Sequence, residues 1–197
     1  VGAHIGSFIY ALLDRFPNAQ VVACEAHPAN IPVPTQNIWQ WRARAVAMPK
    51  AVVANPTEPA WLHSTIFDGT GNTGGSYVEQ GEAPTKQFSD EYRGKIGVSC
   101  IALDEVASRL LLQGDPVRPH RKIDLVKLDC EGSEEGILST CNLELYNCFV
   151  GEWHNKSNFL KIVKERFPSD AWSFDILRDQ TCGLFRLCRR SFSHPTT

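Results

Sequence analysis

The chain has 197 residues, of which 43% are hydrophobic and 21% are charged. These fractions are close to those of folded globular proteins, so they exclude the disordered and fibrous classes. Lys and Arg number 20 against 22 acidic residues, a net charge of −2. This balance argues against a nucleic-acid partner, because such proteins carry a basic excess. No apolar run approaches the roughly 20 residues of a membrane span, so no membrane partner is expected.

The first half of the chain alternates between helical and β-rich patterns. Apolar residues from Ile5 to Phe16 recur at helical spacing, and Pro17 ends that helix. The elements expected after it are a strand at 20–25, a helix that begins near Pro34 and a strand at 43–48. Residues 49–95 are rich in Gly, Pro, Thr and Asn, with short strands expected at 61–67 and 76–79. We interpret this segment as an antiparallel insertion or lid.

Regular alternation resumes in the second half. The expected elements are a strand at 97–103, a helix at 104–112, a strand at 123–129, a helix at 133–140, a strand at 148–153, a helix at 158–167 and strands at 172–177 and 183–188. Residues 123–129 are nearly all apolar, as in a strand covered on both faces. The pattern predicts a single α/β domain over 1–190, followed by a tail at 191–197. Its sheet is expected to be mostly parallel, with helices on both faces and an antiparallel C-terminal strand pair.

A small-residue loop opens the first predicted helix. Residues 1–6 read VGAHIG; small residues let a backbone turn sharply and approach a ligand, and the helix N-terminus offers unpaired N–H groups. Glu25 ends the next predicted strand, about 20 residues after the loop, where a carboxylate can accept both hydroxyls of a ribose. The alternatives are an ordinary turn and a solvated strand-end acid. The pair fits dinucleotides and S-adenosylmethionine alike, and the G-x-x-x-G spacing leans away from dinucleotides.

Acidic side chains also gather where two later strands end. The stretch KLDCEGSE at 127–134 places Asp129 and Glu131 at the exit of the most apolar strand. There they are candidates to hold a cationic methionine group, to act as a general base or to bind a hard metal ion. Helix-dipole stabilisation explains the acids at 134 and 135 but not Asp129. The stretch GEWH at 151–154 adds Glu152 and His154, whose imidazole can take a hydroxyl proton near neutral pH. For His154 the alternative is a surface histidine that caps a loop.

The cysteines are scattered along the chain. They number seven, at positions 24, 100, 130, 141, 148, 182 and 188, and no C-x-x-C pair occurs. We therefore expect neither a disulfide framework nor a zinc site. Most of them lie in apolar runs, where cysteine behaves as a small hydrophobe. The pattern favours a reducing compartment and hence a cytoplasmic location.

Four stretches of the chain resemble the FkbM family of S-adenosylmethionine-dependent methyltransferases. They are VGAHIGSF at 1–8, VVACEAHPAN at 21–30, LDEV at 103–106 with IDLVKLDCEGSEEGIL at 123–138, and VGEWH at 150–154. The most specific is KLDCEGSE, which is similar to the family's K-x-D-x-E-G-x-E signature position by position. Family members usually carry a full strand before VGA, so the first strand is expected to be missing here or to lie upstream.

The resemblance implies a Rossmann-like class I methyltransferase fold with S-adenosyl-L-methionine as the cofactor. A divalent metal is compatible with the sequence but not required by it. For the cofactor, the implied contacts are Gly2, Ala3, His4 and Gly6 on the methionine-ribose side, Glu25 at the ribose hydroxyls, and Ala26 and Ala47 at the adenine. For the chemistry, Asp129 is implied beside the reacting centre, with Glu131, Glu152 and His154 facing the acceptor and either His154 or Asp129 as the base.

The resemblance also implies O-methylation of a small-molecule acceptor, such as a sugar or another natural product. Two other functions stay open. A nicotinamide-dependent oxidoreductase would use the same loop and acid, and a non-catalytic cofactor-binding fragment of a methyltransferase would keep the fold without turnover. The sequence specifies neither the acceptor nor the oligomeric state.

Overall fold

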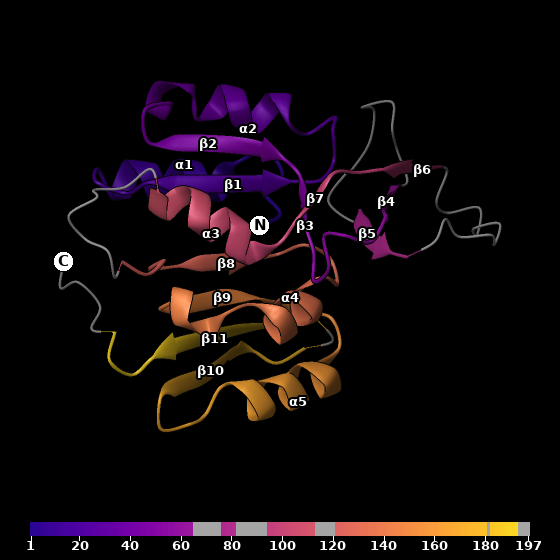
Figure 1. The fold of residues 1–197 in the computed structure, drawn as a ribbon. Helices are drawn as coiled ribbons and strands as arrows, with labels where there is room; N and C mark the ends of the chain where they lie inside the picture. The colour runs from indigo at the N-terminus through magenta and orange to yellow at the C-terminus, as the bar shows by residue number, and fades with distance from the viewer. Residues whose placement is uncertain (65–75, 82–93, 113–120, 181, 193–197) are drawn as a thin grey trace.

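Two groups of strands form the centre of the computed structural model, which describes residues 1–64, 76–81, 94–112, 121–180 and 182–192. The first group is β1 (Val21–Glu25) with β2 (Ala45–Pro49), paired in parallel. The second group has the order β10–β11–β9–β8. Its members are β8 (Val126–Leu128), β9 (Cys148–Trp153), β10 (Trp172–Arg178) and β11 (Gly183–Arg189). β8 and β9 are parallel, whereas β10 and β11 form the expected antiparallel pair, so the predicted α/β class is confirmed (Figure 1).

Residues 1–3 lie between the two groups of strands. The main-chain nitrogen of Val1 donates a hydrogen bond to the carbonyl of Lys127 on β8 (2.8 Å). The N–H of Ala3 donates to the carbonyl of Cys24 on β1 (3.1 Å). In Figure 1 the start of the chain accordingly lies between β1 and β8. Across the molecule the order is therefore β2, β1, residues 1–3, β8, β9, β11 and β10.

Helices cover both faces of β1. In the described ranges the α-helices are α1 (Ser7–Arg15), α2 (Pro32–Asn37), α3 (Leu103–Leu112), α4 (Glu134–Thr140) and α5 (Lys156–Arg166), with 3-10 turns η1 (Trp39–Trp41) and η2 (Leu143–Leu145). Ala23 packs in one cluster with Ile9 of α1, while its neighbour Cys24 packs in another with Val106 of α3. Because successive side chains of a strand point to opposite faces, α1 and α3 lie on opposite sides. None of the described helices has the length and apolar character needed to cross a membrane.

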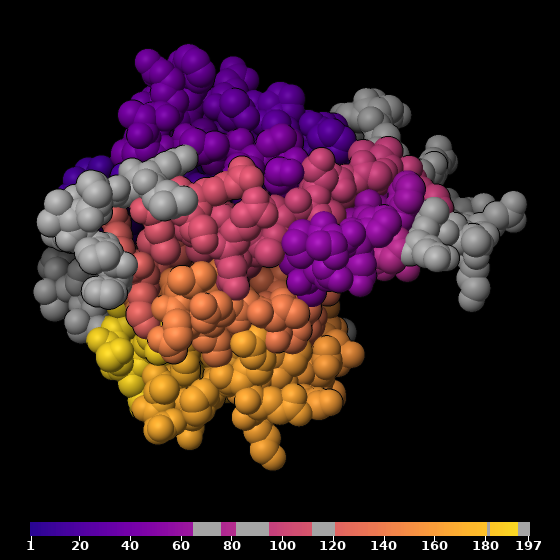
Figure 2. Space-filling model, in the orientation of Figure 1, coloured from indigo at the N-terminus to yellow at the C-terminus, as the bar shows by residue number. Residues whose placement is uncertain are grey.

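A second, smaller sheet rises beside the carboxyl ends of the main strands. It has the order β5–β4–β6 and is antiparallel, with β4 (Ala60–Ser64), β5 (Tyr77–Gln80) and β6 (Gly94–Gly97). Two short parallel strands, β3 (Ala51–Val52) and β7 (Cys100–Ile101), join it to the main body. In Figure 2 this part of the chain projects from one side of the molecule. The antiparallel strands expected inside 49–95 are thus confirmed as far as the described residues reach, and a lid function stays a prediction.

Several predicted elements differ from the structure in extent. The strand expected at 123–129 is ordered as β8 only at Val126–Leu128, and Leu125 is 40% exposed, so the prediction of a strand covered throughout was wrong. The strand expected at 97–103 is divided between β6 and β7. α5 begins two residues before the predicted start because the Asn155 side chain accepts a hydrogen bond from the N–H of Asn158 and caps it. Of the predicted tail, only 191 and 192 lie among the described residues.

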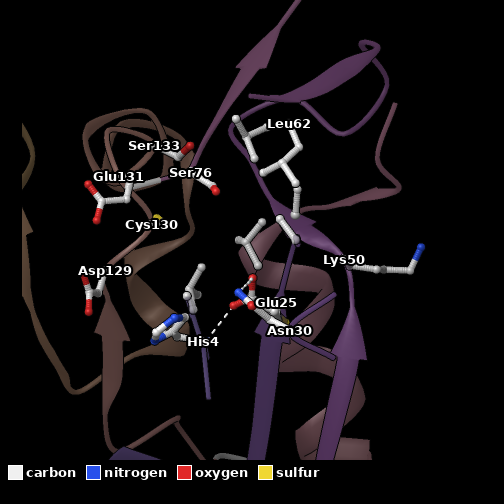
Figure 3. Close-up of a pocket in the computed structure, with 17 residues that line it drawn as sticks. His4, Glu25, Asn30, Lys50, Leu62, Ser76, Asp129, Cys130, Glu131 and Ser133 are labelled. Carbon is white, nitrogen blue, oxygen red and sulfur yellow. Dashed lines mark hydrogen bonds between the residues drawn. The ribbon is translucent and has the colours of Figure 1, made fainter. Parts of the chain in front are cut away.

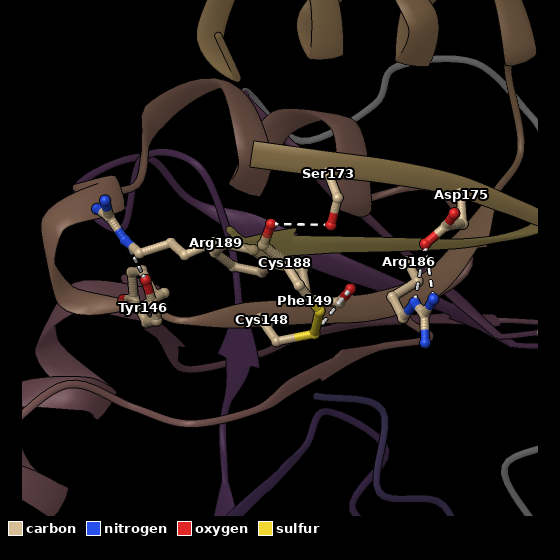
Figure 4. The surroundings of a disulfide bond; sticks show 8 residues. All are labelled: Tyr146, Cys148, Phe149, Ser173, Asp175, Arg186, Cys188 and Arg189. Atoms are coloured by element: carbon tan, nitrogen blue, oxygen red, sulfur yellow. Dashed lines mark hydrogen bonds and ion pairs between the residues drawn. A yellow bond between two sulfur atoms is a disulfide. The ribbon is translucent and has the colours of Figure 1, made fainter. Parts of the chain in front are cut away.

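One pair of cysteines is bonded. Cys148 on β9 lies directly opposite Cys188 on β11, and the two form a disulfide (Figure 4). The other five cysteines are free thiols. A single pair is no disulfide framework, yet the expectation that these two cysteines act only as small apolar side chains was wrong. They are 40 residues apart, and only the register of β9 against β11 brings them together.

Candidate functional site

A cleft opens where β1 and β8 end and the small sheet begins (Figure 3). It holds about 700 Å³ of empty space, part of which is open to solvent. Its lining comes from the 1–6 loop, from the ends of β1 and β8, and from β4 and β5. Among the predicted site residues, those that line it are Gly2, His4, Glu25, Ala26, Asp129 and Glu131. The cleft is therefore at the sheet edge where ligands of α/β proteins bind.

Glu25 ties the N-terminal loop to the turn that follows β1. The side chain is only 7% exposed, and its Oε2 accepts a hydrogen bond from the N–H of His4 (2.6 Å). Its Oε1 accepts from the N–H of His27 (2.9 Å) and from Nδ2 of Asn30 (3.2 Å). A carboxylate offers about four acceptor positions. With three in use, Glu25 has room for about one ribose hydroxyl, and accepting both requires one of these contacts to give way.

The glycines of the loop serve the path of the chain. Gly2 has φ +69°, and a Cβ on it would lie 1.6 Å from the carbonyl oxygen of Asp129, so the loop crosses the end of β8 where no side chain fits. Gly6 has φ +84° and faces Pro34 of α2, which a Cβ would meet at 3.1 Å. Both positions use the left-handed backbone that glycine adopts without penalty. Gly2 also lines the cleft, while the space on the Cβ side of its Cα is filled by the carbonyl of Asp129. That small residues here admit a ligand stays a prediction.

One wall of the cleft is apolar with a hydroxyl edge. Leu62 on β4 lies opposite Val78 on β5, and Ser76 lies two residues before Val78. Because alternate residues of a strand point to the same face, these three side chains line the cleft together. Ser76 Oγ donates to Ser64 Oγ (3.0 Å), which lies 3.2 Å from Nε2 of His27. Sequence reasoning assigned His27 no role and did not single out the serines. The alternation of side chains along β4 and β5 was visible in the sequence, but the pairing of these two strands was not.

The opposite wall is acidic. Figure 3 shows Asp129 and Glu131 on the side of the cleft away from Leu62 and Lys50. Asp129 pairs with the ammonium of Lys127, two residues earlier on the strand. Glu131 has φ +54°, an uncommon conformation for a residue with a side chain. Its Oε2 lies 3.2 Å from Nε2 of His154, so the structure brings these two predicted residues together.

Two acids that the sequence assigned to the helix dipole hold this wall in place. Glu134 is fully buried and accepts hydrogen bonds from the N–H groups of Cys130 (2.6 Å) and Gly132 (2.8 Å). Burial opposes ionisation of Glu134, but hydrogen bonds from His154 and from the backbone of Cys130 outweigh it and lower the pKa of this carboxyl. Glu135 accepts from the N–H of Asn155 (3.1 Å). The two acids therefore fix the loops after β8 and β9.

Five predicted site residues lie outside the cleft lining. Glu152 is absent from the lining and pairs with Arg178 on β10 (3.2 Å). Ala3, Gly6 and Ala47 are absent from the lining, and Ala3 and Ala47 pack against the cluster under α1. His154 does not line the cleft either; its ring lies beside Glu131, which does, and beside the buried Glu134. Within the described ranges, no group of three or more His, Cys, Asp or Glu side chains is arranged to hold a metal ion.

An α/β sheet with a strand-end carboxylate turned toward a glycine loop is the arrangement of an enzyme that binds a nucleoside cofactor. The chain belongs to the FkbM methyltransferase family, because the model of the Methyltransferase FkbM domain matches residues 1–178. A comparison with curated proteins finds no match. The predicted family is thus confirmed, and family membership supports methyltransferase activity and, in general, the use of S-adenosylmethionine.

Proposed function

We propose that this protein transfers a methyl group from S-adenosylmethionine to a hydroxyl oxygen of a sugar or another small natural product. The observation that carries the proposal is the contact between Glu25 and the 1–6 loop. The carboxylate, at the end of β1, accepts the N–H of His4 at 2.6 Å at the mouth of the cleft. A nucleoside ribose is bound at this place in sheets of this kind.

The lining of the cleft fits an adenosyl ligand. Glu25 and Asn30 would meet the ribose, and the apolar surface of Ala26, Leu62 and Val78 would pack against a base. Asp129 and Glu131 supply negative charge at the other end, where a sulfonium is stabilised. When bound, the cofactor supplies an activated methyl group. The chain itself then has to orient the acceptor and receive its proton.

The strand order supports a Rossmann-like methyltransferase fold, with residues 1–3 in the central position between β1 and β8. We propose a small-molecule acceptor, with neither a nucleic acid nor a membrane as partner, because the net charge is −2 and the cleft is lined by both polar and apolar side chains. The cytoplasmic location inferred from unpaired cysteines loses its basis, since Cys148 and Cys188 are bonded.

Calorimetric titration tests the proposal. S-adenosylmethionine and S-adenosylhomocysteine are expected to bind the wild-type chain. Glu25→Ala is expected to weaken that binding about 10–100-fold, the cost of losing a hydrogen bond to a charged group. Glu105→Ala is the matched control, because Glu105 is an exposed acid that pairs with Arg109 on α3. Circular dichroism checks that both variants fold, since Glu25 also holds backbone N–H groups.

Two further arms separate the rival functions. NADH titrated under the same conditions should produce no heat, and heat from NADH alone would favour the oxidoreductase. Methyl transfer is then measured over a panel of monosaccharides and hydroxylated small molecules. Cofactor binding without transfer to any member of the panel would favour the non-catalytic alternative.

A further inference from the structure

The imidazole of His154 is enclosed by carboxylates. Its Nε2 lies 3.2 Å from Oε2 of Glu131, and its Nδ1 lies 3.3 Å from Oε2 of Glu134. Glu135 approaches the backbone of the same residue, with its Oε1 3.4 Å from the N–H of His154. On β9 itself the nearest acid, Glu152, is engaged with Arg178. His154 thus faces three acids from the β8–α4 region and no competing cation among the described partners.

The protonation state of His154 follows from this geometry. A neutral imidazole carries one N–H and one lone pair. A carboxylate within 3.3 Å of each ring nitrogen favours the protonated ring, which has an N–H at both, although Nδ1 is not aligned for a hydrogen bond. The Glu134 carboxylate, supported by Glu131 and Glu135 and opposed by burial, raises the pKa of His154 to about 9. The surrounding carboxylates therefore favour the imidazolium form at neutral pH. An imidazolium has no lone pair to accept a proton, so it does not suit the role of base.

Glu131 is the acid that His154 holds. The carboxylate lines the cleft from a residue with φ +54°, and Gly132 continues the turn at φ +102°. The left-handed backbone is retained because Glu134 binds the N–H groups on either side of Glu131, and costs of this kind are concentrated at functional sites. Burial raises the pKa of Glu131, and the positive charge of His154 counteracts that rise.

We propose that His154 is a charged positioning residue, which fixes the Glu131 carboxylate at the acidic wall and keeps it ionised, and that Glu131 takes the proton of the acceptor. This inference rests on the proposed methyl transfer. The acceptor oxygen forms its bond to the methyl carbon, and the carbon–sulfur bond breaks with its electron pair left on sulfur. The hydroxyl proton passes to Glu131. The other strand-end acid, Asp129, pairs with Lys127 and is left to stabilise the sulfonium, as proposed above.

Side-chain NMR titration tests this assignment without cofactor or acceptor. In the wild-type chain the ring nitrogens of His154 are expected to stay protonated at pH 7. In His154→Gln the carboxyl of Glu131 should titrate about one pH unit higher than in the wild type, the effect of removing one close opposite charge. His154→Lys retains the charge and should restore the Glu131 titration toward that of the wild type, which a purely structural role would not do.

Glu79→Gln is the control. It removes the carboxylate that lies 3.0 Å from Nε2 of the buried His63, and it should leave the signals of His154 unchanged. A neutral His154 ring at pH 7 would overturn the proposal, as would an unchanged Glu131 titration in His154→Gln. If His154→Gln does not fold, the titration of the His154 ring in the wild-type chain still tests the proposal. Because no cofactor is present, this result is separate from the calorimetric test of the proposed function.

Discussion

Gly2 shows how closely the N-terminal loop and β8 approach each other. The position that a Cβ would occupy is 1.6 Å from the carbonyl oxygen of Asp129. No rotamer change can relieve that overlap, because the atom in the way belongs to the backbone. Any larger residue must push the loop and β8 apart, and this displacement would also move His4 relative to Glu25.

Gly2→Ala is expected to lower the free energy of unfolding and to weaken S-adenosylhomocysteine binding. Gly81→Ala is a matched control, since Gly81 also has a positive φ (+121°) but nothing within 4 Å of its Cβ position. The control measures the cost of a positive φ without steric overlap, about 1–3 kcal/mol. Overpacking should add about 1–3 kcal/mol for Gly2→Ala. Urea denaturation measures both, and equal losses in the two variants would contradict the close approach.

Individual site residues were predictable where position in a strand decides their place. The carboxyl ends of parallel strands meet at one edge, so Glu25 and Asp129 could be placed at the same cleft from sequence. Glu152 could not, because it pairs with Arg178, 26 residues further along the chain, and no local pattern shows that pairing. The roles of Glu134 and Glu135 were missed because an acid at a helix start has an adequate local explanation.

Two arginine side chains hold the carboxyl-terminal ends of helices α1 and α4 in place. Arg44, just before β2, donates to the carbonyls of Leu13 (2.8 Å), Phe16 (3.0 Å) and Ala19 (3.0 Å), where α1 ends. Arg166 does the same at the end of α4. Carbonyls in the last turn of a helix lack partners within the helix, and a cation there also meets the negative end of the dipole.

Arg44→Met is expected to destabilise the protein by about 2–3 kcal/mol, because it removes charged hydrogen bonds to three carbonyls. Arg42→Met, two residues away, is the control; Arg42 is exposed and contacts only Trp39 among the interactions described. The difference in denaturation midpoint between the two variants measures the contribution of the cap. A loss below about 0.5 kcal/mol in Arg44→Met would show that water replaces the arginine at little cost.

The carboxylates around His154 should make the free energy of unfolding fall at alkaline pH. The folded pKa of His154 is raised from 6.5 to about 9, so its stabilising contribution is complete below pH 6.5 and is lost as the pH rises through 9. Its upper limit is about 3 kcal/mol. Urea denaturation between pH 6 and pH 9.5 should show a steeper decline for the wild type than for His154→Gln. Parallel curves would mean that the ring gains nothing from its carboxylates.

Elements defined by local pattern were predicted well, and elements defined by distant partners were not. α1, β1, β9 and the β10–β11 pair follow from periodicity and turn residues. In the predicted apolar stripe, however, Phe8 of α1 and Phe16 just after it are 44% and 50% exposed, because only Ile9 and Leu13 are buried against the sheet. The short β3–β7 pairing joins segments about fifty residues apart in the chain, and no local signal encodes it.

At the scale of the whole molecule, the Cys148–Cys188 bond closes a 40-residue segment that contains α5 and β10. Linking distant positions restricts the unfolded chain. Alkylation of the denatured protein followed by mass spectrometry should modify five cysteines without reductant and all seven after reduction. Seven modified cysteines in the unreduced sample would show that the two thiols are free in solution and would restore the argument for a reducing compartment.

A ligand bound in the cleft would connect the two groups of strands, as residues 1–3 already do. The two groups of strands meet there through a hydrogen bond to β8 on one side and one to β1 on the other. A molecule that lies across the cleft touches Glu25 on one half and Asp129 on the other, so it spans the same joint. We therefore expect a bound ligand to make the two groups of strands unfold in a single transition. Without it, the group that contains β1 and β2 can open separately. A ligand bound in the cleft would in this way contribute to the stability of the whole molecule.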